Sequence, residues 1–297
     1  MDLLVANLGS TSFKYRLFRC EGAEPVLVTK GGYERVTDYE ACIGEMLAAL
    51  TAEGHLARPE DLAAVGFKTV LGKDLSGCVE GDDAIIAALD GFSDVAPAHN
   101  PPYAAGLRSF ARQLPDTRRI ALFETAFYQW VPDAARAYAL PRAWRDRGIQ
   151  RYGFHGASHK FVAERSAECL GNAAVAERVR GLYVDGPGTP TGTPLRVVSC
   201  HLGGSSSVTG IHHGLAIGTS MGFSPQSGLP QNNRVGDLDA MAFPYAMKQL
   251  GLNAEEAERQ LTKEGGLLGL SGVSNDLRDI NEAVTGGNVD AALAIDV

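Results

Sequence analysis

The first half of the chain alternates short apolar runs with segments whose apolar residues recur at helical spacing. Residues Asp2 to Ala6 form an apolar run, Phe13 to Phe18 nearly alternates between apolar and polar residues, and the polar turn Gly9 to Ser12 lies between them. This pattern predicts a β-hairpin. Further predicted elements, in chain order, are a helix over Tyr39 to Leu50, a strand over Ala63 to Phe67, helices over Asp82 to Leu89 and Pro101 to Leu114, and a strand over Arg119 to Phe123.

A charged, irregular segment, Pro141 to Gly148, separates this half from the next. It predicts two domains, residues 1–147 and 148–297. The second half is predicted to contain a helix over Lys160 to Leu170, a surface loop over Gly181 to Pro194, a buried strand over Leu195 to Cys200, a strand–turn–strand over Ser205 to Thr219 and then a run of helices.

Two regions of the chain begin alike, with a strand followed by a turn of small residues. They are Val5 to Ser12 and Val198 to Ser207. Such a weak duplication is compatible with two related domains that face a cleft. Together with the alternation of strands and helices, it predicts an α/β fold.

The composition excludes some classes of function but says little about the fold. The 297 residues are 45% hydrophobic, with a net charge of -8 and a pI near 5.4, which argues against a nucleic-acid surface or a basic membrane face. No apolar run approaches the roughly 20 residues that span a bilayer. The five cysteines are scattered and never spaced C-x-x-C, as in reduced cytosolic proteins. We therefore expect a soluble, cytoplasmic protein.

Two turns of small residues could each hold an anion. Asn7 to Lys14 offers backbone N–H groups and hydroxyls with a lysine beside them, and His201 to Ser207 repeats the design. Taken alone, each segment is better interpreted as a simple hairpin turn, because Asn, Gly and Ser are favoured there. Neither matches the Walker A pattern or G-x-G-x-x-G, so two common nucleotide-binding folds are not supported.

Two further segments carry candidate chemistry. His155 and His159 are four residues apart, as zinc ligands on a helix can be, but the neighbouring glycines disfavour helix at His155. A histidine between glycines is better interpreted as a hydrogen-bonding group in a cleft. Arg234, before Asp237 and Asp239, could clamp a phosphoryl group, or it could be a solvated arginine beside aspartates that cap the next helix.

In their order along the chain these segments resemble the acetate kinases, members of the acetate and sugar kinase/Hsp70/actin superfamily. The segments that carry the resemblance are Asn7 to Lys14, Ala96 to Pro102, Phe123 to Phe127, Tyr138 to Pro141, Arg151 to His159, His201 to Gly203, Thr219 to Phe223, Arg234 to Asp239 and Gly266 to Gly272. The resemblance implies a two-domain actin-like ATPase fold, also called ribonuclease H-like, with mixed sheets and a cleft for nucleotide and carboxylate.

The resemblance also implies an activity, in which a carboxylate oxygen attacks the γ-phosphorus of ATP in line and forms an acyl phosphate. Mg²⁺ is the implied cofactor, short carboxylates and ATP or ADP are the implied ligands, and a homodimer is the implied assembly. The implied catalytic residues are Glu124, His155 and Arg234. The implied carboxylate pocket comprises Lys68, Val70, Ala98, His99, Phe154 and Pro225. The implied phosphate-binding residues are Ser10, Ser12, Lys14, His201, Gly203 and Gly204, with Asn7 in the metal shell.

Several positions depart from the family pattern. Lys68 replaces an arginine that helps to hold the carboxylate, and lysine lacks the planar bidentate fork. Glu124 replaces an aspartate, so the two changes together could form a compensated pair or could mark a weakened site. Gly204 and Ser205 replace an Asn-Gly pair in the phosphate loop. Ala98 replaces a leucine, which could admit propionate or butyrate.

The end of the chain raises a competing hypothesis. Asn288 to Val297 reads as the opening of an amphipathic helix, and the family's later Gly-Gly-x-Gly-Glu segment, which holds adenine, does not appear. We therefore expect the second domain to be incomplete. The alternative to a working kinase is a non-catalytic, degenerate relative that binds phosphate or carboxylate.

Overall fold

The computed structural model describes residues 1–9, 11–22, 24–73, 75–94 and 100–297. It divides into two compact units, Met1–Gln129 (unit 1) and Trp130–Val297 (unit 2). The division falls earlier in the chain than the predicted boundary after residue 147. The irregular segment that suggested that boundary lies inside unit 2, where it forms two short helices, α4 (Asp133–Arg136) and α5 (Arg142–Arg145).

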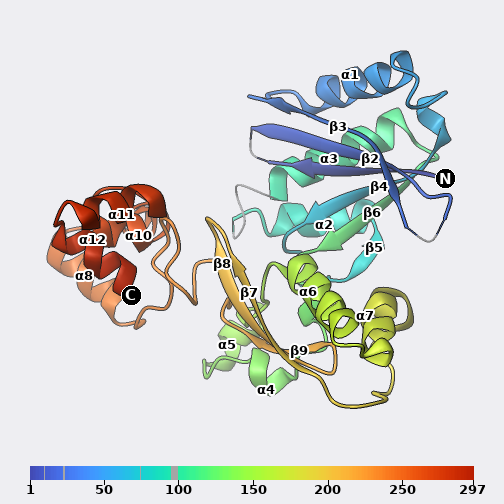
Figure 1. Cartoon of the computed structure of the whole chain (residues 1–297). Helices are drawn as coiled ribbons and strands as arrows, with labels where there is room; N and C mark the ends of the chain where they lie inside the picture. Colours follow the sequence, from blue (N-terminus) through green and yellow to red (C-terminus); the bar gives the residue numbers. More distant parts are fainter. Residues whose placement is uncertain (10, 23, 74, 95–99) are drawn as a thin grey trace. The chain divides into compact units, whose positions relative to one another are not determined.

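Unit 1 is built on a mixed six-stranded sheet in the order β3-β2-β1-β4-β6-β5 (Figure 1). Strands β1, β2 and β3 form an antiparallel meander, and β1, β4 and β6 run parallel. The predicted hairpin and both other predicted strands are present; β3 and β5 were not predicted. The strands are β1 (Asp2–Leu8), β2 (Ser12–Arg19), β3 (Val26–Glu34), β4 (Leu62–Thr69), β5 (Cys78–Glu80) and β6 (Arg118–Phe123).

Three helices accompany this sheet, α1 (Tyr39–Ala52), α2 (Asp83–Gly91) and α3 (Asn100–Gln113). Helix α3 contacts β1, β4 and β6 and packs between α1 and α2. Gly106 lets α3 approach β1 closely, because a Cβ there would lie 2.5 Å from Cδ2 of Leu8. The core of unit 1 contains the buried side chains Leu4, Leu8, Val65, Phe67, Phe110, Ala121 and Phe123.

Unit 2 contains a three-stranded antiparallel sheet, β7 (Arg196–Leu202), β8 (Ser206–His212) and β9 (Leu215–Thr219). Helix α6 (Gly156–Cys169) packs against β7 and against α7 (Ala173–Asp185). The predicted loop over Gly181 to Pro194 is wrong in its first part, because α7 continues to Asp185. Buried apolar residues such as Val179 and Leu182 hold its last turns in place despite Gly181.

The rest of unit 2 is helical, as predicted. Helices α10 and α11 pack against α12 around Ile280, Ala291 and Ala294. Asn288 caps α12, since its Oδ1 accepts from the backbone N–H of Ala291. Within the described residues, no helix is long and apolar enough to cross a membrane. These helices are α8 (Ala242–Leu250), α9 (Ala254–Lys263), α10 (Gly266–Ser271), α11 (Leu277–Thr285) and α12 (Val289–Asp296).

Candidate functional site

In unit 1, two charged residues meet at the carboxyl ends of neighbouring parallel strands. Lys68 lies near the end of β4 and Glu124 follows β6 directly. The Lys68 ammonium and the Glu124 carboxylate form an ion pair, with the lysine side chain 50% exposed and the glutamate 10% exposed. The backbone N–H of Glu124 donates to the carbonyl of Thr69 at 2.8 Å, which fixes the backbone from which the carboxylate side chain extends. Lys68 and Glu124, two of the residues expected to depart from the family pattern, are therefore paired with each other.

Asn7 lies on β1, the strand beside β4. Its Oδ1 accepts a 2.8 Å hydrogen bond from the hydroxyl of Tyr103 on α3. Burial, and secondarily the charge of Glu124, raise the pKa of Tyr103, so the phenol stays protonated and keeps donating. This bond orients the amide of Asn7 and leaves a second lone pair on its oxygen.

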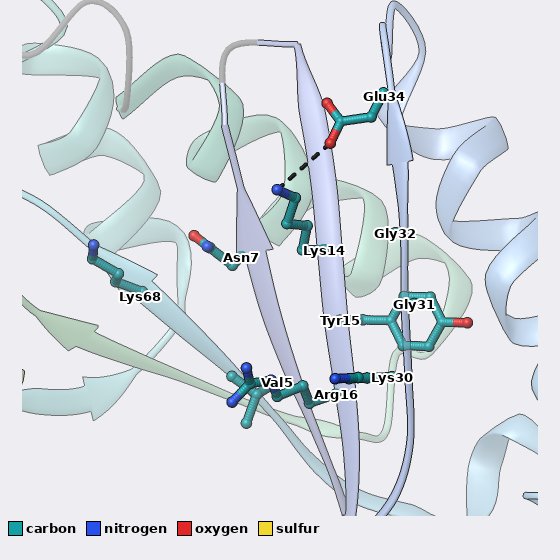
Figure 2. A pocket seen from close by; sticks show the side chains of 10 residues that line it. All are labelled: Val5, Asn7, Lys14, Tyr15, Arg16, Lys30, Gly31, Gly32, Glu34 and Lys68. Carbon is teal, nitrogen blue, oxygen red and sulfur yellow. Dashed lines mark ion pairs between the residues drawn. The ribbon is translucent and has the colours of Figure 1, made fainter. Parts of the chain in front are cut away.

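A hollow of about 620 Å³ lies over this part of the sheet (Figure 2). Lys14 projects into it and pairs with Glu34 at 3.5 Å. Ser12 does not line the hollow; its carbonyl closes the preceding turn by accepting from the backbone N–H of Gly9 at 2.7 Å. The residues that line the hollow are Val5, Asn7, Lys14, Tyr15, Arg16, Lys30, Gly31, Gly32, Glu34 and Lys68.

Three of the predicted site residues, Ser10, Ala98 and His99, lie outside the described residues. Val70 follows β4 and is buried, with 5% of its surface exposed.

In unit 2, a chain of histidines and serines joins helix α6 to the sheet. His155 precedes α6 in the left-handed region, with φ of 62°, and its Nδ1 lies 2.8 Å from Oγ of Ser207. The same hydroxyl lies 2.7 Å from Nε2 of His159, whose Nδ1 lies 2.8 Å from Oγ of Ser199. The two histidines considered as zinc ligands are thus bridged by a serine.

His159 lies in a fully buried environment with Ser207 and Ser199. Burial, with smaller contributions from the charges of His155 and His201, lowers the pKa of His159 to about 4. At neutral pH its ring therefore carries one proton, so one nitrogen donates and the other accepts. Both serines can then be satisfied without burying a charge.

His201 lies one residue before the end of β7, on the same face of the strand as Ser199. Its ring stacks on that of His155, with 4.0 Å between centroids, and its Nδ1 lies 3.0 Å from Oγ of Ser158. The structure therefore brings two of the predicted histidines together. Ser207 and Ser158, which bond to these rings, lie inside the segments His201 to Ser207 and Arg151 to His159, but their spacing gave no sign of this role.

Arg234 is held by a polar loop rather than left in solvent. Its Nη1 donates to Oγ of Ser205 at 3.0 Å and, at 3.4 Å, to Oε1 of Gln231 and to the carbonyl of Pro225. Gln231 is 1% exposed and also donates to the Pro225 carbonyl at 2.9 Å. Neither aspartate is the N-cap of α8, which is Met241: Asp237 accepts from the backbone N–H of Gly228, and Asp239 accepts from that of Met241. Gln231, an unremarkable residue in the sequence, is the centre of this arrangement.

The predicted phosphate turn opens onto a second hollow, of about 750 Å³, within unit 2. At Gly204 a Cβ would lie 3.2 Å from Nδ2 of Asn232, so glycine allows the turn to pack closely there. Phe154, predicted to line the carboxylate pocket, precedes His155 and is 1% exposed.

The polar residues that line this second hollow could not be identified from the sequence. Its lining includes Leu202, Gly203, Ser206, Gln231, Asn232, Asn275, Asp276, Leu277 and Asn281.

Comparison with known proteins assigns the family. The profile of the Acetokinase family matches residues 28–182 and 187–297. An acetate kinase from Staphylococcus haemolyticus is 36% identical over 321 residues, covering 99% of this chain and 75% of the relative. The chain belongs to the Acetokinase family. An acetate kinase from Geobacillus kaustophilus is 35% identical over 319 residues, covering 99% of this chain and 76% of the relative.

Solved structures of the Acetokinase type agree with this assignment. The structure of a Porphyromonas gingivalis acetate kinase matches with a TM-score of 0.83 and 31% identity. The match covers 99% of this chain and 76% of the P. gingivalis chain. The structure of a propionate kinase from Francisella tularensis matches with a TM-score of 0.82 and 28% identity. This match covers 100% of this chain and 76% of the F. tularensis chain. The predicted actin-like ATPase fold with a mixed sheet is confirmed. As a family member, this chain is an ATP-dependent kinase with a carboxyl group as acceptor.

Proposed function

We propose that this protein phosphorylates a short carboxylate, acetate in the first instance, with ATP, and that the reaction is reversible. One carboxylate oxygen attacks the γ-phosphorus in line, a new O–P bond forms, and the bond to the β-phosphate oxygen breaks to leave acetyl phosphate and ADP. The observation that carries the proposal is the Lys68–Glu124 ion pair beside Asn7, on a chain of the Acetokinase family. It supports a site in which both altered residues keep their charges and contact each other.

In unit 1, we propose that the Lys68 ammonium attracts the substrate carboxylate. The half-exposed side chain can do so while Glu124 remains within reach. Lysine acts here as a point charge, so it orients the carboxylate less strictly than an arginine fork would. The proposal therefore includes weaker carboxylate binding, seen as a raised KM, rather than loss of the chemical step.

In unit 2, we propose that Arg234 stabilises the equatorial oxygens of the transferring phosphoryl group. The anchoring of its guanidinium by Ser205 and Gln231 supports this role, because preorganised donors stabilise a transition state without reorganisation. His155 and His201 would donate to the same group from their stacked rings. The hollow beside Gly203 would take the nucleoside of ATP, and the turn itself would take its phosphates.

Mg²⁺ fits the residues present only as an ion held mainly by phosphate and water. The described residues contain no group of three or more His, Cys, Asp or Glu side chains that could hold a metal. Asn7 offers a hard oxygen ligand with one lone pair left by Tyr103. Magnesium commonly keeps several waters and binds few protein groups together with substrate phosphates. When bound, it would neutralise phosphate charge, and Asn7 would help to hold it.

The test is an assay of acyl phosphate formation by the full chain with ATP, Mg²⁺ and acetate. We expect turnover, and we expect Lys68→Ala to raise the KM for acetate more than it lowers kcat. No turnover above background with any carboxylate of two to four carbons would overturn the proposal and favour the degenerate, binding-only relative. Calorimetry with ATP then separates that relative, which still binds, from a chain that has lost both functions.

A preference for propionate or butyrate is a second candidate, favoured by Ala98 and by the propionate kinase among the similar structures. A substrate panel on the native chain and on Ala98→Leu decides between the two. We expect the leucine to shift preference toward acetate; an unchanged preference would remove the argument.

The homodimer rests on the family resemblance and the cytoplasmic location on the composition of the sequence, and both stay predictions. Sedimentation of the purified chain tests the first, and a dimer is the expected result.

A further inference from the structure

The neighbouring strands β2 and β3 of unit 1 carry two exposed cations that the proposed chemistry does not use. Arg16 on β2 and Lys30 on β3 are direct cross-strand partners in the antiparallel register. Both are exposed, and neither head group has a hydrogen bond or an ion pair with any residue that the structure describes. Like charges directly opposite each other destabilise an antiparallel pair. The fold therefore gains nothing from this arrangement, which points to a ligand.

The two cations belong to a larger positive surface. The hollow of about 620 Å³ has four cations and one carboxylate in its lining, Lys14, Arg16, Lys30 and Lys68 against Glu34. Glu34 is engaged by Lys14, and Lys68 by Glu124. Figure 2 shows Arg16 and Lys30 side by side on one row, with Lys14, Asn7 and Lys68 on the next row.

The register gives the spacing of these groups. Arg16 pairs with Val5 and Lys30, and Lys14 pairs with Asn7 and Gly32. Neighbouring strands lie roughly 5 Å apart and alternate residues on a strand roughly 7 Å apart. An extended anion with several charged groups can therefore contact three of the cations at once, whereas a single short carboxylate contacts one.

Gly32 keeps the space beside these cations open. A Cβ at this position would lie 3.0 Å from the carbonyl oxygen of Phe13 and 3.1 Å from Cγ of Lys14. Any side chain here would crowd the stem of Lys14 and enter the hollow between Lys14 and Lys30. The glycine, in the middle of a strand where it weakens the sheet, is thus consistent with a place that a ligand approaches closely.

We infer that Arg16 and Lys30, together with Lys14, form a second anion site, which binds a phosphate chain in the same hollow as Asn7 and Lys68 but through different side chains. Arginine and lysine together suit this ligand, because guanidinium recognises phosphate oxygens bidentately and ammonium adds a point charge. The inference does not depend on catalytic turnover, since Arg16 and Lys30 have no role in the proposed reaction, and only Lys14 is shared with the implied phosphate-binding turn.

Inorganic tripolyphosphate is the probe, titrated into the full chain by calorimetry without added metal. We expect binding that weakens with salt, because dissolved ions screen the attraction between the anion and the exposed cations. The double variant Arg16→Gln/Lys30→Gln should bind roughly tenfold more weakly or worse. Arg196→Gln, which removes an exposed strand arginine in unit 2, is the matched control and should change nothing. Equal affinity in the double variant would overturn the site.

Melting curves supply an independent readout. Without ligand the double variant should melt at the same temperature as the native chain or higher, because a like-charge pair has been removed. Tripolyphosphate should raise the melting temperature of the native chain and not that of the double variant. A lower melting temperature of the unliganded double variant would show that the two side chains serve the fold, which would contradict the inference.

Two competition experiments separate this site from its alternatives. Binding of tripolyphosphate should persist in saturating ADP; displacement by ADP would mean that the probe occupies the proposed phosphoryl-transfer site, and the second site would be overturned. Citrate tests the ligand class, since it is a compact trivalent anion. We expect weaker binding of citrate than of tripolyphosphate, and equal affinity would overturn the assignment to a phosphate chain.

Discussion

Unit 1 and unit 2 both contain a strand, a turn of small residues and an antiparallel second strand, but they place polar groups in opposite environments. On β2 of the β1–β2 hairpin and on the neighbouring strand β3 the charged side chains stand on an exposed surface, and Lys14 and Glu34 are 63% and 70% exposed. On the β7–β8 hairpin, Ser199 and Ser207 are buried together with His159. The same local design thus supports a solvated charged surface in one unit and a neutral hydrogen-bonded network in the other.

The difference follows from what covers each hairpin. Helix α6 lies on the face of β7 that carries Ser199 and His201, so polar groups there must satisfy one another. A charge in that place would cost several kcal/mol, and the lowered pKa of His159 is the consequence. On the exposed hairpin water satisfies the charges, and ion pairs there contribute little. Four predictions test this contrast, from the largest expected effect to the smallest.

Replacing Arg234 by alanine should have the largest effect. Removing a preorganised charge-stabilising group typically costs about 10²–10³ in kcat, and a catalytic arginine in phosphoryl transfer up to about 10⁵. We expect a loss of about a thousandfold in kcat, with a smaller change in the KM for acetate. Arg259→Ala, on the exposed surface of α9, is the control. Comparable kcat values for Arg234→Ala and the native enzyme would remove Arg234 from the mechanism.

The stability of unit 2 should depend on pH through His159. Its pKa is lowered from 6.5 to about 4 in the folded state, so the unfolded chain binds the additional proton between these values. The free energy of unfolding should therefore fall as the pH drops from about 6.5 to about 4, by up to about 3 kcal/mol. Urea titrations at several pH values measure this.

A His159→Gln variant supplies the control for that slope. Glutamine does not titrate, so this part of the pH dependence should disappear, while the lost hydrogen-bond geometry lowers stability at pH 7 by about 1–3 kcal/mol. An unchanged slope in the variant would assign the pH dependence to another group.

In unit 1, Tyr103→Phe removes the hydroxyl that orients Asn7. A hydrogen bond of this kind contributes about 1 kcal/mol, so we expect a loss of that size in the free energy of unfolding. If Asn7 serves the metal shell, the Mg²⁺ concentration required for half-maximal activity should also rise. Phe110→Leu, which alters the same helix without touching Asn7, separates the two effects. A magnesium requirement that rises equally in both variants would argue against a role for the hydroxyl.

The smallest effect should come from the exposed hairpin. Lys14→Gln breaks the ion pair with Glu34, and such exposed pairs contribute about 0–1 kcal/mol. We expect a change in unfolding free energy below about 0.5 kcal/mol, and a smaller one still in high salt. A loss as large as that of His159→Gln would show that the two hairpins do not differ as described.

Much of the architecture could be predicted from local pattern. The N-terminal hairpin, the strands β4, β6 and β7 and the helices α1, α2, α3 and α6 follow apolar periodicity, because burial of one face stabilises each element whatever its neighbours are. Strand β3 escaped prediction because its centre is Thr-Lys-Gly-Gly, and it exists only because β2 offers it a partner. The last turn of α7, after Gly181, was not predicted for a related reason: the burial of Leu182 stabilises the helix more than the glycine weakens it.

The motifs contained several of the site residues but not their partners. His155, His201, Arg234, Lys68 and Glu124 could be named because their order along the chain matches a family. The contacts of His155 with Ser207, His201 with Ser158 and Arg234 with Ser205 join residues 29 to 52 positions apart, and no periodicity encodes such distances. Local apolar periodicity therefore predicted the type of most elements, and the order of the motifs along the chain predicted the family. Strand register and helix packing, which arise only when the chain folds, decide which serine holds which histidine. They also decide the pairing of Lys68 with Glu124 and the placement of Arg16 beside Lys30.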